Sequence, residues 1–251
     1  MTMGYKCYQC SKEFEDKPDF FASPATLRIM HYCSSGQGYC PDCAKKEARQ
    51  RTWDSIPSAY EHCSLKHFTI SKENENAFRK TEIWCEDPQG FVFLYGPSGV
   101  GKTHLAVGAA LRLGLMKGKW VQFSSAPQLM ADCRMAAAAG PGEENPDMLI
   151  DRYIYRYHYL VIDDIGVEKP SEFVQEKMYR LIDGRFASDR PTIITSNFSL
   201  DELASRLGER LASRIGSGVV AEVRGDDYRL KHHFEPGPQD EKPEATVKTV
   251  N

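Results

Sequence analysis

The stretch Gly96-Pro97-Ser98-Gly99-Val100-Gly101-Lys102-Thr103 constrains the structure of this chain more than any other. It fits the pattern G-x-x-x-x-G-K-[ST], and it stands directly after the apolar run 91–95 and before a helical pattern that begins at Lys102. Its glycines let the backbone turn tightly, so that N–H groups and the positive end of the next helix point at a phosphate. The residues of the predicted nucleotide site are Gly96, Pro97, Ser98, Gly99, Val100, Gly101, Lys102, Thr103 and His104.

Lys102 and Thr103 have separate expected roles at this site. The ammonium group of Lys102 would neutralise the β and γ phosphates, and the hydroxyl of Thr103 would ligate Mg²⁺. A second magnesium-organising group is needed at the end of a neighbouring strand, and the run Tyr159-Leu-Val-Ile-Asp163-Asp164 supplies it. We expect Asp163 to hold the metal through water and Asp164 to orient or deprotonate the attacking water. An acidic turn after a core strand is the alternative interpretation.

Short apolar runs alternate with helical patterns from about Ser64 onward. The runs are rich in β-branched and aromatic residues, which favours strands over 91–95, 120–123, 159–162, 192–195 and 219–223. Helical patterns cover 102–115, 127–139, 171–186 and 200–215. Strands that alternate with helices predict an α/β fold with a mostly parallel sheet covered on both faces.

Two further groups of polar residues follow the later strands. Thr195-Ser-Asn197 ends one strand, and the amide of Asn197 could reach a γ-phosphate or the lytic water; an ordinary Ser-Asn turn is the alternative. Arg206, Arg210 and Arg214 are spaced by four beside an apolar stripe, so we expect an exposed ridge on one helix. The ridge is either a solvated basic face or the source of an arginine that completes the ATP site of a neighbouring copy.

The composition is that of a globular protein with an excess of cysteine. The chain has 251 residues, of which 41% are hydrophobic and 27% charged, and its formal net charge is −3. This balance excludes wholesale disorder, and no apolar run approaches the roughly 18 residues of a membrane span. A slightly acidic chain has no global positive field, so DNA binding would need several copies together. The first residues carry no export signal, so we expect the cytosol.

Five of the eight cysteines crowd into the first 43 residues, in two C-x-x-C pairs and a single cysteine. The four predicted zinc ligands are Cys7, Cys10, Cys40 and Cys43. Two such pairs in a segment with few aliphatic residues indicate a tetrahedral zinc site, because four thiolates can hold a fold that a small core cannot. His31 or Cys33 is the alternative for one ligand.

Changes of composition divide the chain into four predicted segments. Residues 1–50 form a zinc-binding module that docks a partner, and residues 51–63 form a polar linker. Residues 64–232 form the nucleotide-binding core. Residues 233–251, with prolines among charges, form a disordered tail. Three single cysteines, Cys63, Cys85 and Cys133, are expected to be small core residues.

The order of these motifs resembles the AAA+ ATPases of the DnaC/DnaI-type helicase-loader and IstB-type transposition-helper group. The resemblance covers residues 55–230. It is carried by Ile56-Pro57 and Phe68, GPSGVGKTHLA (96–106), YLVIDDIG (159–166), PTIITSN (191–197), GERLASRI (208–215) and GDDYRLK (225–231). The order and spacing of the blocks are far more specific than any single block. Loaders of the DnaI type also carry an N-terminal zinc-bearing module that binds a partner.

The resemblance implies ATP and Mg²⁺ as ligands and a role for each motif. It implies a Walker A motif at 96–103, a Walker B motif at Asp163 and Asp164, a sensor at Asn197, an arginine finger at Arg214 and a γ-phosphate-sensing arginine at Arg229. Arg210 is the rival for the finger. Phe68 and its neighbours either border the adenine or belong to the core.

The function that the resemblance implies is loading of a replicative helicase during DNA replication. Copies of the chain would associate through the ATP site and bind single-stranded DNA once assembled, with no contact to a membrane. A transposase is the alternative client. Because Asp164 is shorter than glutamate, we expect slow turnover without a partner. A P-loop kinase and a regulator that binds ATP without turnover are the other classes.

Overall fold

The computed structural model describes residues 4–7, 11, 13–15, 37–38, 41–140 and 142–228. Its main body is a five-stranded sheet in the order β5-β6-β7-β4-β8, in which every pair of neighbours is parallel. The strands are β4 (Phe91–Tyr95), β5 (Val121–Ser125), β6 (Tyr159–Asp163), β7 (Thr192–Ser196) and β8 (Val219–Glu222). All five predicted strands are therefore present.

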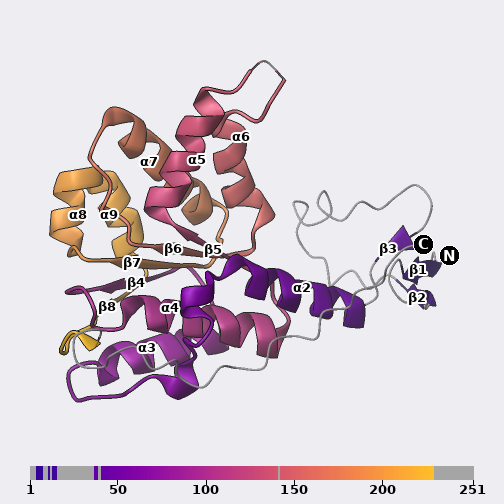
Figure 1. The fold of residues 1–251 in the computed structure, drawn as a ribbon, viewed down its shortest axis with the longest axis horizontal. Coiled ribbons are helices and arrows are strands. Elements are labelled where there is room, and N and C mark those ends of the chain that lie inside the picture. Colours follow the sequence, from indigo (N-terminus) through magenta and orange to yellow (C-terminus); the bar gives the residue numbers. More distant parts are fainter. Residues whose placement is uncertain are drawn as a thin grey trace.

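Helices lie on both sides of this sheet (Figure 1). One side carries α3 (Glu75–Glu86) and α4 (Lys102–Leu111), with α2 (Pro41–Ser55) along the β5 edge. The other side carries α5 (Ala126–Ala137), α6 (Pro146–Asp151), α7 (Glu172–Ala187), α8 (Leu200–Leu207) and α9 (Glu209–Gly216). Two 3-10 turns cover Ser58–Tyr60 and Leu65–His67, and π-helical turns at Arg112–Met116 and Arg152–Arg156 extend α4 and α6. The predicted α/β fold is confirmed.

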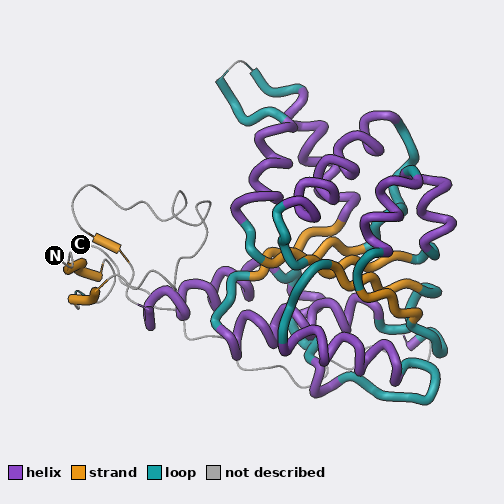
Figure 2. Tube along the Cα trace, turned by 180° about the vertical axis from the view of Figure 1, so that it is seen from behind, coloured by secondary structure: helices purple, strands orange, loops and turns teal. Residues whose placement is uncertain are grey.

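The central strands contribute to two hydrophobic cores at once. In β4, Val92 and Leu94 are buried in the core under α3 and α4, whereas Phe91 and Phe93 are buried in the core under α5 to α9. This division follows from the strand geometry, because successive side chains point to opposite faces. Figure 2 shows the strands as a layer between the two sets of helices. A sheet buried on both faces leaves only its strand ends free for a ligand.

Residues 51–63, expected to be a linker, pack against the sheet instead. Trp53 is 3% exposed and belongs to the core shared with α4. The backbone N–H of Val121 donates to Thr52 Oγ1 (3.0 Å), and that of Phe123 donates to Ser55 Oγ (3.1 Å). These hydroxyls satisfy donors of the edge strand β5 that would otherwise lack partners. The end of α2 therefore closes this edge of the sheet.

The predicted helix 200–215 is two helices in the structure. Gly208 separates α8 from α9 with a φ of 104°, a conformation that glycine adopts without the strain of a Cβ atom. A capping box of Ser199 and Glu202 begins α8, as the sequence predicts. Because of the break, Arg206 lies on one helix and Arg210 and Arg214 on the next. The prediction of a single ridge of arginines on one helix is therefore wrong.

A second, small sheet lies near the start of the chain. Its strand β1 (Gly4–Cys7) pairs antiparallel with β2 (Glu13–Glu15) and parallel with β3 (Gln37–Gly38). The predicted tail, residues 233–251, lies outside the described residues. Among the helices of the described ranges, none combines the length and the apolar character that crossing a bilayer requires.

Candidate functional site

The phosphate-binding pattern forms a loop between the end of β4 and the start of α4. Gly96, Gly99 and Gly101 have φ values of 145°, 78° and 98°, which L-residues with a Cβ atom rarely adopt. The backbone N–H of Gly96 donates to the carbonyl of Ser196 at the end of β7 (3.2 Å). The loop therefore starts beside the end of the neighbouring strand, at the carboxyl edge of the sheet where α/β proteins bind ligands.

Each of these three glycines has a close neighbour from another part of the chain. A Cβ atom at Gly96 would lie 2.2 Å from the carbonyl oxygen of Val223, just beyond β8. A Cβ atom at Gly101 would lie 2.8 Å from the ring of Phe68. At Gly99 it would overlap the carboxylate of Asp227. Gly96 thus serves close packing as well as the turn, because its neighbour is backbone that leaves no space for a side chain.

Lys102 and His104 lie at the start of α4 and differ in what they bind. The ammonium group of Lys102 donates to the carbonyl of Pro97 (2.6 Å), so it lies folded over the loop. His104 instead donates from Nε2 to the carbonyl of Ser64 (2.8 Å). Its ring also packs edge-on against Phe68, with 5.3 Å between the ring centres. The side chain of His104 therefore attaches the preceding segment to α4.

Asp163, the last residue of β6, is bound by two hydroxyl groups. Thr103 Oγ1 donates to its carboxylate at 3.0 and 3.2 Å, and Thr195 Oγ1 donates at 2.6 Å. Burial raises the pKa of Asp163 to about 6, although the two hydroxyl hydrogen bonds and the charge of Lys102 oppose this shift. Three elements, α4, β6 and β7, thus meet at one carboxylate.

Thr103 and Asp163 suit a magnesium ion by their chemistry. Mg²⁺ prefers oxygen ligands, and it is commonly held by one or two protein groups together with phosphate and water. A hydroxyl and a carboxylate lie within 3.2 Å of each other here, beside the phosphate-binding loop. The two predicted magnesium ligands are therefore brought together.

Asp164 follows with a φ of 58°, the left-handed region that aspartate tolerates better than most residues. Its backbone N–H donates to Thr195 Oγ1 (2.9 Å). Thr195 thus binds both acidic residues of the motif, and sequence reasoning missed it. The signal was a threonine next to the last residue of β7, and its role depends on β7 being the neighbour of β6.

The predicted sensor and the three arginines occupy different places. Asn197 follows β7 directly, next to the start of the loop, and is half-buried. Arg206 Nε donates to the carbonyl of Gly166 (2.7 Å), close to the acidic motif of its own chain. Arg214 Nε donates to Asp183 Oδ1 (3.0 Å). Arg210 makes no side-chain hydrogen bond, ion pair or ring contact with any residue in the described ranges.

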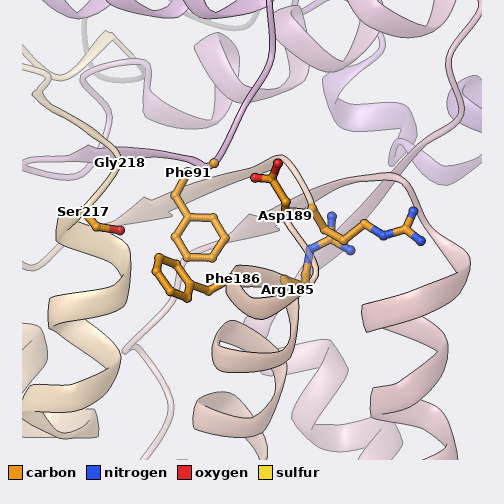
Figure 3. Close-up of a pocket in the computed structure, with 8 residues that line it drawn as sticks. Phe91, Arg185, Phe186, Asp189, Ser217 and Gly218 are labelled. Atoms are coloured by element: carbon orange, nitrogen blue, oxygen red, sulfur yellow. The ribbon is translucent and has the colours of Figure 1, made fainter. Parts of the chain in front are cut away.

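Arg214 lies beside a pocket at the opposite end of β4 from the phosphate-binding loop. The pocket has a volume of about 330 Å³ and is lined by Gly90, Phe91, Arg185, Phe186, Asp189, Arg190, Ser217 and Gly218 (Figure 3). The guanidinium of Arg214 lies 4.5 Å from the centre of the Phe186 ring. β4 has five residues at about 3.3 Å each, so its two ends are about 13 Å apart.

The remaining predicted site residues lie wholly or partly outside the described residues. These are Arg229, Cys10 and Cys40, together with the alternative ligands His31 and Cys33. Of Cys7 only the backbone is described, within β1, and Cys43 is buried in the first turn of α2. Cys63, Cys85 and Cys133 are buried, which confirms their prediction as core residues; burial raises the pKa of their thiols to about 12, 12 and 11.

The loop after β4, its lysine and threonine, and the carboxylate at the end of β6 define a P-loop nucleotide-binding protein with the AAA+ fold. Residues 77–236, more than half of the chain, match the family model described as "IstB-like ATP binding protein". The chain belongs to this family, as its resemblance to the DnaC/DnaI and IstB group predicts.

Several replication proteins are similar to this chain. The replicative helicase loader DnaC of Escherichia coli K12 is 29% identical over 191 residues, which are 72% of this chain and 76% of the relative. The initiator DnaA of Gluconobacter oxydans is 30% identical over 65% of this chain and 34% of its own length. A crystal structure of the DnaC helicase loader has a TM-score of 0.59 and 24% identity, and covers 67% of this chain and all of that one. The structure of AMPPCP-bound DnaA from Aquifex aeolicus also has a TM-score of 0.59, with 22% identity, and the match covers 68% of this chain. It covers 52% of the DnaA chain, so this chain spans about half of the DnaA length.

Proposed function

We propose that this protein hydrolyses ATP between two copies of itself and uses the cycle to load a replicative helicase onto DNA. The placement of Arg214 carries this proposal. Its side chain is fixed at the far end of β4 from its own phosphate-binding loop. An arginine held there cannot reach its own ATP, so it would complete the site of a neighbouring copy.

The residues around Asp163 have distinct roles in this proposal. The loop N–H groups and Lys102 bind the phosphates, and Thr103 and Asp163 hold Mg²⁺, which when bound neutralises charge on the β and γ phosphates. Asp164 orients the water and accepts its proton, and Asn197 contacts the γ-phosphate from the β7 side. Arg229 senses that phosphate too: the backbone N–H of Tyr228, its neighbour, donates to the Gly99 carbonyl (3.0 Å).

The relatives support a helicase and single-stranded DNA as partners. A helicase loader acts on a helicase, and one similar solved structure is of DnaA bound to AMPPCP and single-stranded DNA. We therefore propose a helicase as the client and single-stranded DNA as a second ligand of the assembled protein, in the cytosol. Residues 1–50 would dock the client, with zinc on the four cysteines of the two C-x-x-C pairs. Elemental analysis should find zinc equimolar with the chain, and replacing Cys10 and Cys40 by serine should remove it.

A transposition helper is the second candidate, because the matching family model carries the IstB name. The two candidates differ in the client and share the ATP site. Capture of interacting proteins with the full chain as bait would separate them: a hexameric helicase supports the first and a transposase the second.

ATP turnover of the purified chain tests the enzymatic part. We expect slow hydrolysis that rises more steeply than linearly with protein concentration, because each site needs a neighbour, and that increases with single-stranded DNA. Tight ATP binding without turnover under every condition would identify a binding-only regulator. ADP formation that depends on an added hydroxyl acceptor would identify a kinase.

A further inference from the structure

Arg214 is held in place by two residues of a different helix. Its Nε donates to Asp183 Oδ1 (3.0 Å), and its guanidinium carbon lies 4.5 Å from the centre of the Phe186 ring. Asp183 and Phe186 both belong to the last turns of α7, whereas Arg214 belongs to the last turn of α9. The contacts therefore fix the end of one helix against the end of another.

These contacts use one donor and one face of the guanidinium. Nε–H is bound to the carboxylate, and the Phe186 ring covers the planar group. Its two terminal amino groups have no hydrogen-bond partner among the described residues, and 44% of the side chain is exposed. The terminal amino groups form the fork that binds phosphate oxygens in a bidentate manner. The arginine is thus ordered at its base and open at its tip.

Neither of the other two arginines combines these properties. Arg206 is directed to the carbonyl of Gly166 in its own chain, with its guanidinium 4.3 Å from the Phe198 ring. Arg210 has no ordering contact within the part of the chain that the structure describes. A long side chain without such contacts loses more rotamer freedom when it binds, which weakens its effect on a reacting group.

We propose that Asp183 and Phe186 are positioning residues for Arg214, and that they hold its guanidinium ready for the ATP of a neighbouring copy. This assignment rests on the proposed function, because it needs a site shared between two copies. The pair orients the arginine before assembly, so that no freedom of the side chain has to be lost when the neighbour docks.

Arg185, between the two positioning residues in sequence, fixes the rotation of α7. It is fully buried, and its guanidinium donates to oxygens of Thr192, Tyr153, Tyr157, His158 and Pro191 at 2.6 to 3.0 Å. Because Arg185 points into the protein, residues 183 and 186 on either side of it point elsewhere on the helix. Figure 3 shows Phe186 beside Phe91, which is the first residue of β4.

The test compares turnover of Asp183→Ala and Phe186→Ala with the wild type and with Arg214→Ala. We expect kcat to fall at least about tenfold in both, with KM for ATP within about twofold, because ATP binds to an unchanged loop. Asp183→Asn and Phe186→Tyr keep an acceptor and a ring, and should retain most activity. Asp151→Ala is the matched control, since Asp151 binds Arg180 of the same helix α7 at 2.8 Å with similar exposure.

A mixing experiment separates positioning from damage to the fold. Asp164→Asn copies should bind ATP and assemble but not hydrolyse, while still presenting an intact Arg214. Mixed with Asp183→Ala copies, they should restore turnover at the ATP sites of the Asp183→Ala copies. The positioning role alone is overturned if this restoration fails. It is also overturned if Asp183→Ala has a normal kcat while Arg214→Ala is impaired. No turnover in the wild type, or a normal kcat in Arg214→Ala, overturns the proposed shared site together with it.

Discussion

Thr195 illustrates how much one hydroxyl can organise at this site. It donates to Asp163 and accepts from the backbone N–H of Asp164, so both acidic residues depend on it. Its side chain is fully buried, which means that water cannot replace a lost hydrogen bond without rearrangement.

Thr195→Val should lower both turnover and stability. Valine keeps the shape but leaves the Asp164 N–H without an acceptor, which costs about 1–3 kcal/mol of folding free energy. We expect kcat to fall about tenfold as Asp164 loses its fixed position. Steady-state kinetics and urea unfolding measure the two effects. Thr81→Val is the control, since Thr81 is equally buried but binds only a carbonyl of its own helix; equal losses of kcat in the two variants would contradict the role of Thr195.

Lys102→Ala should abolish nucleotide binding while leaving the fold intact. The ammonium group is the single side-chain cation of the loop, and its removal leaves the phosphates with backbone donors only. Isothermal titration with ATP and Mg²⁺ measures the loss. Lys117→Ala removes another lysine that binds carbonyls, those of Cys85 and Glu86, and should bind ATP normally. Normal ATP affinity in Lys102→Ala would remove the basis for the site.

Residue types and spacing predicted much of the site but not its cross-strand contacts. The loop and the carboxylate after β6 are local patterns, because each motif lies within a few consecutive residues. The bond from Thr195 to Asp163 joins residues 32 positions apart and exists only because β7 lies beside β6. The carbonyl of Ser64 as the partner of His104 was likewise not predictable from local sequence.

The break between α8 and α9 shows that local patterns also fail to predict where some helices end. Arginines and leucines keep helical spacing through Gly208, so periodicity alone predicts one helix. The structure places Gly208 in a left-handed conformation, and the apolar stripe continues because both helices pack on the same core. A glycine within a periodic pattern therefore marked an end rather than a tolerated interior residue.

Gly208→Ala should destabilise the protein by about 1–2 kcal/mol. No atom lies within 4 Å of the added Cβ, so the cost comes from the backbone conformation alone. Urea unfolding measures it. Gly140→Ala is the matched control, because its Cβ also meets nothing within 4 Å while its φ lies outside the left-handed region. Gly140→Ala should be neutral or slightly stabilising, and an equal loss in both variants would contradict the strain at Gly208.

At the scale of the whole molecule, acid should weaken the fold through His158. Although His158 is exposed at the surface, desolvation of its ring by neighbouring groups lowers its pKa to about 4, and the charges of Arg190, Lys119 and Arg185 add to this effect against the opposing Asp189. Arg190 Nη1 donates to His158 Nδ1 (3.0 Å), so a proton on that nitrogen would break the bond. The unfolded chain takes up this proton near pH 6.5, before the folded protein does.

The contribution of His158 is therefore complete above pH 6.5 and declines as the pH falls toward 4. Between pH 7.5 and pH 5, the melting temperature of His158→Gln should fall less than that of the wild type. Thermal unfolding of both proteins at the two pH values measures the difference, and contributions of other groups cancel in the comparison. Parallel losses in the two proteins would show that His158 stays neutral, or equally charged, in both states.

The sheet as a whole was predictable in kind but not in order. Alternating strand and helix patterns predict parallel strands and two layers of helices. The position of β8 beside β4, and that of β7 between β4 and β6, depend instead on packing between segments that are far apart in the sequence. Residues 51–63 looked like a linker because they are polar, and the hydroxyls that close the β5 edge are among those polar residues. Polarity alone does not separate an exposed segment from one that binds backbone.

The two ends of β4 face in opposite directions, one with the phosphate-binding loop and the other with Arg214. A contact made by unlike ends repeats head to tail and ends only when the last copy meets the first. In an open row of copies, the ATP site at one end has no neighbouring arginine, and the arginine at the other end contacts no ATP site. A closed ring has no such ends. The fraction of bound ATP that stays unhydrolysed after a single turnover would therefore show whether the row has closed.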